Sequence, residues 1–149
     1  MKLNREVFLI GGYPKGYSEP FSQETLSGKR LHAMMHDLKF YPTLLDLWRT
    51  REEESTMDIS PGTAKMLCWY LSGDYPNEVR VGALGDWVFK ALVRSGKRYP
   101  LIGIRIKDGT IRRLPHPAAR RIADHKKLRR QLLNLKEWWA LPALLAEVE

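Results

Sequence analysis

Short apolar runs with strand character alternate with helical patterns through the first two thirds of the chain. The strand-like runs are Val7–Gly11, Pro42–Leu47 and Asn77–Leu84. Apolar runs that are separated by helical segments are typical of a parallel sheet covered by helices on both faces. The sequence therefore predicts an α/β protein with a mostly parallel central sheet.

Helices are predicted around these strands from capping residues and apolar spacing. Ser27 is expected to be the N-cap of the first, which carries an apolar stripe. Ser60-Pro61 is a common pair of N-cap and first-turn residues, and it begins a helix that stops near Gly73. Another helix follows Gly85-Asp86 and ends at Ser95-Gly96. The stripe of the first helix consists of Leu31, Met34, Met35 and Leu38.

Two connections are expected to lack helices. The segment from Trp48 to Ser60 contains an acidic run and is predicted to be a solvated loop. Leu101–Ile106 and Thr110–Leu114 alternate around Asp108-Gly109, a strong hairpin dipeptide, so an antiparallel arm is predicted there.

The last part of the chain, from about Ala118 to Val148, has a helical pattern that is basic at first and then rich in Leu and Trp. Proline removes a helical hydrogen bond, so Leu141-Pro142 is expected to break this helix into two pieces.

Size and charge limit the possible functions. The chain has 149 residues, which corresponds to one domain over residues 1–149. A net charge of +8 favours an anionic partner, either nucleic acid or a membrane surface. Cys68 is the single cysteine, which excludes an internal disulfide and a thiolate metal cage. The apolar run at Val7–Ile10 is too short for a signal peptide or a membrane span, so a cytoplasmic location is expected.

Two loops carry the chemically informative residues. The first strand runs into Gly11-Gly12-Tyr13-Pro14-Lys15-Gly16, in which the glycines permit close approach of the backbone to a ligand. The second loop, 114–121, places His116 between two prolines and beside Arg120-Arg121. Both loops follow strand ends that are far apart in sequence and could meet at one pocket, with the second loop delivered by the second arm of the predicted hairpin. The combination suggests chemistry on a nucleic-acid base.

In their order along the chain, these residues resemble the uracil-DNA glycosylase superfamily. The family's Gly-x-x-Pro loop corresponds to Gly11–Pro14, and its Pro-Phe step to Pro20-Phe21. Its helix start corresponds to Ser27–Leu31, and its His-Pro-Ala loop to His116–Ala118. Residues 79–87 are similar to the family's strand, leucine-glycine turn and helix. The resemblance implies a three-layer α/β/α sandwich with a central parallel four-stranded sheet.

It also implies an activity, namely DNA base excision by base flipping and hydrolysis of the N-glycosidic bond, as in DNA repair. His116 would donate a hydrogen bond to an oxygen of the departing base. Phe21 would stack on the base, and Gly11, Gly12 and Pro14 would line its pocket. No cofactor and no metal are expected.

The residue that orients the attacking water is less clear from the resemblance. The family often has Asp or Asn immediately before the proline of the first motif, whereas this chain has Tyr13. A neutral phenol is a poor base at pH 7, so Glu19 and Asp46 are the candidate carboxylates. Asp46 also stands about where the family often has a base-reading asparagine. Because a carboxylate only accepts hydrogen bonds, a base that presents a donor, modified or damaged, is expected to be preferred over uracil.

The expected partner is DNA, single- or double-stranded, bound by a monomer and without a membrane. Around the two loops, the residues expected to contact DNA are Lys15, Lys29, Arg30, Arg120, Arg121 and Ile122. Phosphate contacts would make affinity fall with salt.

Simpler interpretations remain open. Gly11-Gly12 can be only a tight turn, Phe21 a core residue and His116 an ordinary loop histidine. His32 and His36 lie one helical turn apart, but a third metal ligand is not evident. The alternative function is a glycosylase fold without hydrolysis that binds DNA, a modified base or nucleotide, or a protein partner.

Overall fold

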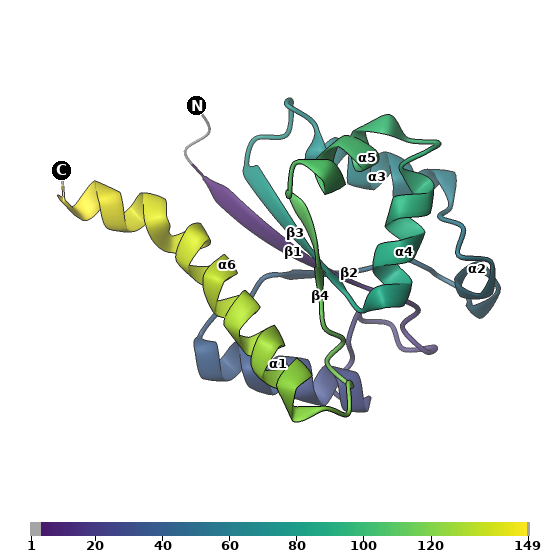
Figure 1. The fold of residues 1–149 in the computed structure, drawn as a ribbon, viewed down its shortest axis with the longest axis horizontal. Helices are drawn as coiled ribbons and strands as arrows, with labels where there is room; N and C mark the ends of the chain where they lie inside the picture. The colour runs from purple at the N-terminus through teal and green to yellow at the C-terminus, as the bar shows by residue number, and fades with distance from the viewer. Residues whose placement is uncertain (1–3, 149) are drawn as a thin grey trace.

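The computed structural model describes residues 4–148, and its strands form one parallel sheet. β1 (Arg5–Gly11) and β3 (Glu78–Leu84) lie at the centre, and β2 (Thr43–Asp46) and β4 (Ile111–Leu114) lie at the edges. The order is β2-β1-β3-β4, with every neighbouring pair parallel. The predicted α/β class and four-stranded parallel sheet are confirmed (Figure 1).

Helices cover both faces of this sheet (Figure 1). They are α1 (Leu26–Leu38), α2 (Arg51–Thr56), α3 (Pro61–Leu71), α4 (Asp86–Ser95), α5 (Pro100–Lys107) and α6 (Ile122–Val148). The alternating side chains of β1 show which helices lie on which face. Val7 and Leu9 pack with buried residues of α1 and α6. Phe8 and Ile10 pack with buried residues of α3, α4 and α5. The three-layer α/β/α arrangement is therefore confirmed.

The start of α1 differs from the prediction. Thr25, and not Ser27, is the N-cap, because its backbone is extended and its side chain accepts a hydrogen bond from the N–H of Gly28 at 3.0 Å. The predicted cap of α3 is confirmed, since the Ser60 side chain accepts from the N–H of Thr63 at 3.2 Å.

The predicted hairpin is wrong. Leu101–Ile106 lies within α5, and β4 pairs with β3 in parallel. A parallel neighbour requires a crossover between the two strands, and α4 and α5 supply it. Asp108-Gly109 ends α5 instead of turning a hairpin, with Gly109 at a φ of 84°.

The acidic connection contains α2, which was expected to be loop. Thr50 is its N-cap and accepts from the N–H of Glu53 at 3.2 Å, while the carboxylate of Glu53 accepts from the N–H of Arg49 at 2.9 Å. This reciprocal pattern is close to a capping box. The spacing Thr-x-x-Glu was the sequence signal that could have predicted the helix.

Pro142 does not break α6, contrary to the prediction. A helical proline leaves the carbonyl four residues earlier without its N–H donor. That carbonyl belongs to Trp138, and it accepts a hydrogen bond from Nη1 of Arg5 at 2.7 Å. The helix therefore continues through Pro142 with the carbonyl satisfied from β1.

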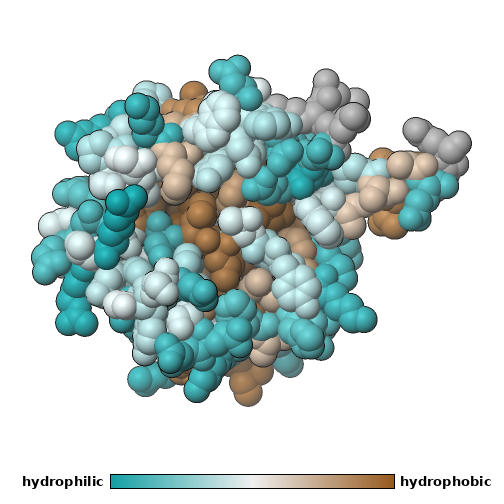
Figure 2. All heavy atoms as spheres, turned by 180° about the vertical axis from the view of Figure 1, so that it is seen from behind, coloured by the Kyte–Doolittle hydropathy of each residue, from teal (hydrophilic) through white to brown (hydrophobic). Residues whose placement is uncertain are grey.

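Beyond this point the end of α6 projects from the body of the molecule (Figures 1 and 2). Its exposed apolar residues include Leu141, Leu144 and Leu145.

Candidate active site at the carboxyl edge of the sheet

The two predicted loops lie at the same edge of the sheet. Gly11 ends β1 and is paired in register with Asp46 at the end of β2. The N–H of Gly85, after β3, donates to the carbonyl of Leu114 at 2.8 Å and so extends the pairing to the end of β4. Ligands of open α/β sheets bind where neighbouring strands connect in opposite directions, which is here between β1 and β3.

A cavity of about 110 Å³ occupies this position. Binding sites for drug-sized ligands are typically about 300–1,000 Å³, so this one suits a single small ring or polar group. Its lining residues are Gly11, Gly12, Tyr13, Pro14, Lys15, Phe21, Ser22, Thr25, Ser27, Asp46, Glu54 and His116.

Phe21 forms an aromatic wall of the cavity, and its ring lies directly on Gly11. A Cβ atom on Gly11 would be 2.3 Å from Cε2 of Phe21, which leaves no room for a side chain. Phe21 is partly buried against the core and has a φ of 50°, so its backbone is in the left-handed region. Nε2 of His32 donates to its carbonyl oxygen at 3.0 Å.

The backbone that carries Phe21 is also fixed by α1. A Cβ on Gly28 would lie 1.9 Å from the carbonyl oxygen of Ser22 and 2.5 Å from that of Phe21. This glycine lets α1 and the loop touch backbone to backbone. The backbone of Phe21 is therefore held by the hydrogen bond from His32 and by direct packing against Gly28.

Glu54 lines the cavity beside Gly12 and Tyr13. Its Oε2 accepts a hydrogen bond from the N–H of Tyr13 at 3.3 Å, and a Cβ on Gly12 would be 3.3 Å from the same oxygen. The same Cβ would lie 3.2 Å from the ring of Trp48, which is fully buried. Gly12 therefore allows the first loop to pass close to both Trp48 and Glu54.

His116 is held in one tautomer by its own loop. Nδ1 accepts the N–H of Ala118 at 3.0 Å, so the proton of the neutral ring is on Nε2. Burial lowers the pKa of His116, and the positive charge of Lys15 lowers it further. The residue still has an exposed face, but the surrounding protein atoms disfavour the charged ring. At neutral pH, His116 is therefore a neutral N–H donor at the cavity.

Asp46 is the second titrating group of the cavity. Burial raises its pKa from 3.8 to about 6. Near neutral pH its carboxylate is the main form, but the proton is held much more readily than by an ordinary aspartate. The cavity thus contains a neutral donor and a carboxyl group of raised proton affinity, a pattern that is common in catalytic sites.

The predicted site residues divide into two groups. His116, Tyr13, Asp46, Gly11, Gly12, Pro14, Phe21 and Lys15 all line the cavity. Glu19 is exposed and does not line it. Lys29, Arg120 and Ile122 are exposed, with 73% of Ile122 accessible to solvent.

Arg30 and Arg121 are engaged within the protein. Nη1 of Arg30 donates to the carbonyl of Ala119 at 3.3 Å, which links α1 to the histidine loop. Nε of Arg121 is 3.3 Å from Oδ2 of Asp124. Arg30 therefore positions the loop, whereas the exposed cations remain available to a partner.

A second hollow of about 380 Å³ lies on the other side of His116. Arg113, Arg121 and Lys127 line it together with two carboxylates: Asp86 pairs with Arg113 at 3.1 Å and Asp124 with Arg121 at 3.3 Å. His116 lines both this hollow and the cavity, so a chain that follows the hollow would pass the imidazole.

Sequence reasoning missed Glu54, because its acidic run has the composition of a solvated loop. It also missed Gly85, whose φ of 99° brings it under the imidazole: a Cβ there would be 3.2 Å from Cδ2 of His116. Ser22 and Thr25 also line the cavity and were not predicted as site residues. Thr25 lies there because it is the N-cap of α1.

The two histidines of α1 have other partners: Nδ1 of His36 lies 3.2 Å from the hydroxyl of Tyr41, and His32 binds the Phe21 carbonyl. Across residues 4–148 there is no cluster of three or more potential metal ligands. Within the same residues, no helix is both long enough and apolar enough to cross a membrane. Comparison with family models, curated proteins and solved structures found no match to this chain.

Proposed function

We propose that this protein is a DNA glycosylase-like hydrolase that removes a flipped, modified or damaged base. In this proposal it works in the cytoplasm as a monomer. The observation that carries the proposal is the neutral Nε2–H tautomer of His116 at a base-sized cavity. Cleavage of the bond between base and sugar leaves the bonding electron pair on the base. A neutral donor near a base oxygen stabilises that developing charge.

The cavity suits a single heterocycle. Its volume of about 110 Å³ is far below that of sites for whole nucleotides, so a base can enter while sugar and phosphate stay outside. Phe21 offers a fixed aromatic surface for stacking. Stacking and edge contacts are what an extruded base gains in return for leaving the duplex.

Two carboxyl groups can act on the attacking water, namely Asp46 and Glu54. The water oxygen bonds to C1′ of the sugar as the C1′–N bond breaks, and one water proton passes to a carboxylate. We assign this role to Glu54, because its carboxylate lines the cavity whereas Glu19 lies outside it. Asp46 then reads the edge of the base, with a preference for bases that present a donor.

The test is a panel of oligonucleotides, single- and double-stranded, each with one uracil, hypoxanthine or oxidised, alkylated or deaminated base. Excision leaves an abasic site, which alkali converts into a strand break. Alkali-dependent strand cleavage at the position of one of these bases supports the proposal. Efficient excision of uracil in preference to all donor-bearing bases contradicts the role of Asp46. Binding should also weaken with salt, because Lys15, Lys29 and Arg120 are exposed cations.

The alternative is a binding protein of the same fold without hydrolysis. The observation that favours it is the hydrogen bond of Glu54 to Tyr13, which uses one carboxylate oxygen for structure. In that case the panel yields tight, base-dependent binding and no strand breaks. His116→Ala would then weaken binding of the preferred base.

A further inference from the structure

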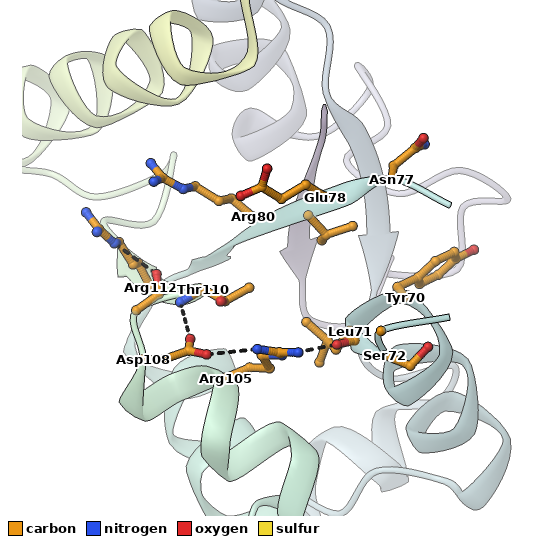
Figure 3. Close-up of a pocket in the computed structure, with 13 residues that line it drawn as sticks. Tyr70, Leu71, Ser72, Asn77, Glu78, Arg80, Arg105, Asp108, Thr110 and Arg112 are labelled. Atoms are coloured by element: carbon orange, nitrogen blue, oxygen red, sulfur yellow. Dashed lines mark hydrogen bonds and ion pairs between the residues drawn. The ribbon is translucent and has the colours of Figure 1, made fainter. Parts of the chain in front are cut away.

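A cavity of about 410 Å³ lies at the amino end of the sheet (Figure 3). It is bordered by the starts of β3 and β4 and by the turn after α5. Arg80 stands four residues before Leu84, the end of β3, so at about 3.3 Å per residue it is about 13 Å from the carboxyl edge. A ligand here would not contact the candidate active site.

Arginines dominate the chemistry of this cavity. Arg80 and Arg112 lie on neighbouring strands and on the same face, because Arg112 pairs with Gly82, two residues after Arg80. Figure 3 shows their side chains extending in the same direction from β3 and β4. Gly82, which stands beside Arg112 on the neighbouring strand, is covered by Leu9 and Leu114: a Cβ there would be 2.9 Å from Cδ2 of Leu9 and 3.0 Å from Cδ2 of Leu114.

The third arginine, Arg105, is already engaged. It donates from Nε to the carbonyl of Leu71 at 3.1 Å and from Nη1 to Asp108 at 3.0 Å, as the dashed lines in Figure 3 mark. These bonds tie α5 to the end of α3 and form one wall of the cavity. Arg105 therefore forms part of the cavity wall, while Arg80 and Arg112 line the cavity from the face of the sheet that α6 covers.

Arg80 and Arg112 lack a matching carboxylate. Within residues 4–148 neither takes part in an ion pair, and Glu78 is paired with Arg5 at 3.5 Å. The pKa of Arg80 is lowered by burial and then by the charges of Arg112 and Arg5, against a smaller opposing effect of Glu78. The guanidinium group of Arg80 stacks on Trp138, 4.5 Å from the ring centroid, which fixes its position.

We propose that this cavity is a second binding site, and that Arg80 and Arg112 hold a phosphate group of a nucleotide or of a nucleic-acid backbone. Two guanidinium groups on one face provide planar sets of N–H donors that match phosphate oxygens, and a phosphate dianion offsets their mutual repulsion. The cavity volume falls within the range of small-molecule sites. The proposal does not depend on the activity assigned to His116.

The experiment is isothermal titration calorimetry of the full chain at low ionic strength. Inorganic pyrophosphate, a nucleoside 5′-monophosphate and a short single-stranded oligonucleotide are the probes. Arg112→Gln is the principal variant because Arg112 is exposed. Its Nε donates a hydrogen bond to the carbonyl oxygen of Gly109 at 3.0 Å. Arg80→Gln is the second variant. Arg98→Gln removes the same charge from an exposed position of another surface and serves as the matched control.

We expect each of Arg112→Gln and Arg80→Gln to weaken pyrophosphate binding about tenfold, the usual effect of losing one charged donor. Arg98→Gln and His116→Ala should leave it unchanged. Tighter binding of the monophosphate identifies a nucleotide as the source, and tighter binding of the oligonucleotide identifies a polymer. The proposal is overturned if pyrophosphate does not bind, or if Arg98→Gln weakens binding as much as Arg112→Gln.

Discussion

The guanidinium group of Arg5 donates to the carbonyl oxygen of Trp138, the acceptor that Pro142 leaves without a helical partner. The first strand thus compensates for a proline near the end of the chain. Arg5 also stacks on the Trp138 ring at 4.7 Å from the centroid. The interaction joins β1 to α6 across 133 residues of sequence.

A double-mutant cycle tests this compensation. Arg5→Met alone should destabilise the protein by about 1–3 kcal/mol, since it removes a charged donor. In the background of Pro142→Ala the new N–H at residue 142 can donate to Trp138, so the cost of Arg5→Met should fall by about 1 kcal/mol. Urea unfolding measures all four proteins. Strict additivity would show that Arg5 does not act as the substitute donor.

The second prediction concerns His116. His116→Ala should lower the single-turnover rate of base excision about 10²–10³-fold, the usual effect of removing a donor that stabilises a leaving oxyanion. Circular dichroism of the variant should show a folded protein, because one face of the His116 ring is exposed to solvent. His36→Ala, also exposed, is the control and should retain the wild-type rate. Equal rates for the two variants would remove His116 from the mechanism.

The third prediction concerns Glu54. Glu54→Gln keeps an oxygen that can accept the Tyr13 N–H but cannot take a proton from water. We expect the excision rate to fall about 10²-fold or more with an unchanged melting temperature. Glu52→Gln, on the exposed side of the same helix, should have no effect. Full activity of Glu54→Gln would show that Asp46 or backbone groups, and not Glu54, act on the attacking water.

The fourth prediction concerns the pH dependence of stability. The pKa of Asp46 is about 6 in the folded protein and near 3.8 when unfolded, so between these values the folded state binds more protons. Its contribution to the free energy of unfolding therefore decreases as pH rises from about 4 to 6. Solvent screening limits this to on the order of 1–2 kcal/mol.

Urea unfolding of wild type and Asp46→Asn at pH 4 and pH 7 isolates this effect. The variant should gain stability relative to wild type at pH 7. His116 contributes in the opposite direction, because its lowered pKa makes stability fall as pH decreases through its range, but this contribution cancels in the comparison. A difference between the two proteins that is the same at both pH values would contradict the raised pKa.

The fifth prediction compares two glycines. Gly11→Ala places a methyl group 2.3 Å from the Phe21 ring, and the overpacking should cost about 1–3 kcal/mol. Gly62→Ala, in the first turn of α3 with nothing within 4 Å, should instead stabilise by about 0.4–1 kcal/mol. Chemical denaturation measures both. A neutral Gly11→Ala would mean that the Phe21 ring moves freely.

Local signals predicted much of the fold. The strand Val7–Gly11, the cap at Ser60 and the helix after Gly85 depend on neighbours in sequence, and the structure contains all three. The segment Leu101–Ile106 was predicted wrongly because β-branched residues at alternate positions favour a strand. The requirement for a crossover between parallel β3 and β4 overrides that preference, and it is a property of the whole sheet.

Part of the candidate site was also predicted from the sequence. The convergence of Gly11, Phe21, Asp46 and His116 follows from two loops at the ends of parallel strands. Glu54 could not be located, because its approach to the cavity depends on how α2 folds back over Gly12. The amino-end arginines were also missed, since only the register of β3 with β4 places Arg80 near Arg112.

The contact of Gly28 with the backbone of Ser22 has a consequence for altering specificity. A helix that rests on a loop without intervening side chains cannot be adjusted by mutation at that point, so the aromatic platform behaves as a rigid fixture of the first helix. If the protein acts on a base as proposed, variation in the choice of base must then come from other lining residues, such as Asp46. Libraries aimed at new substrates should randomise position 46, keep Glu54 and leave residues 20–28 untouched.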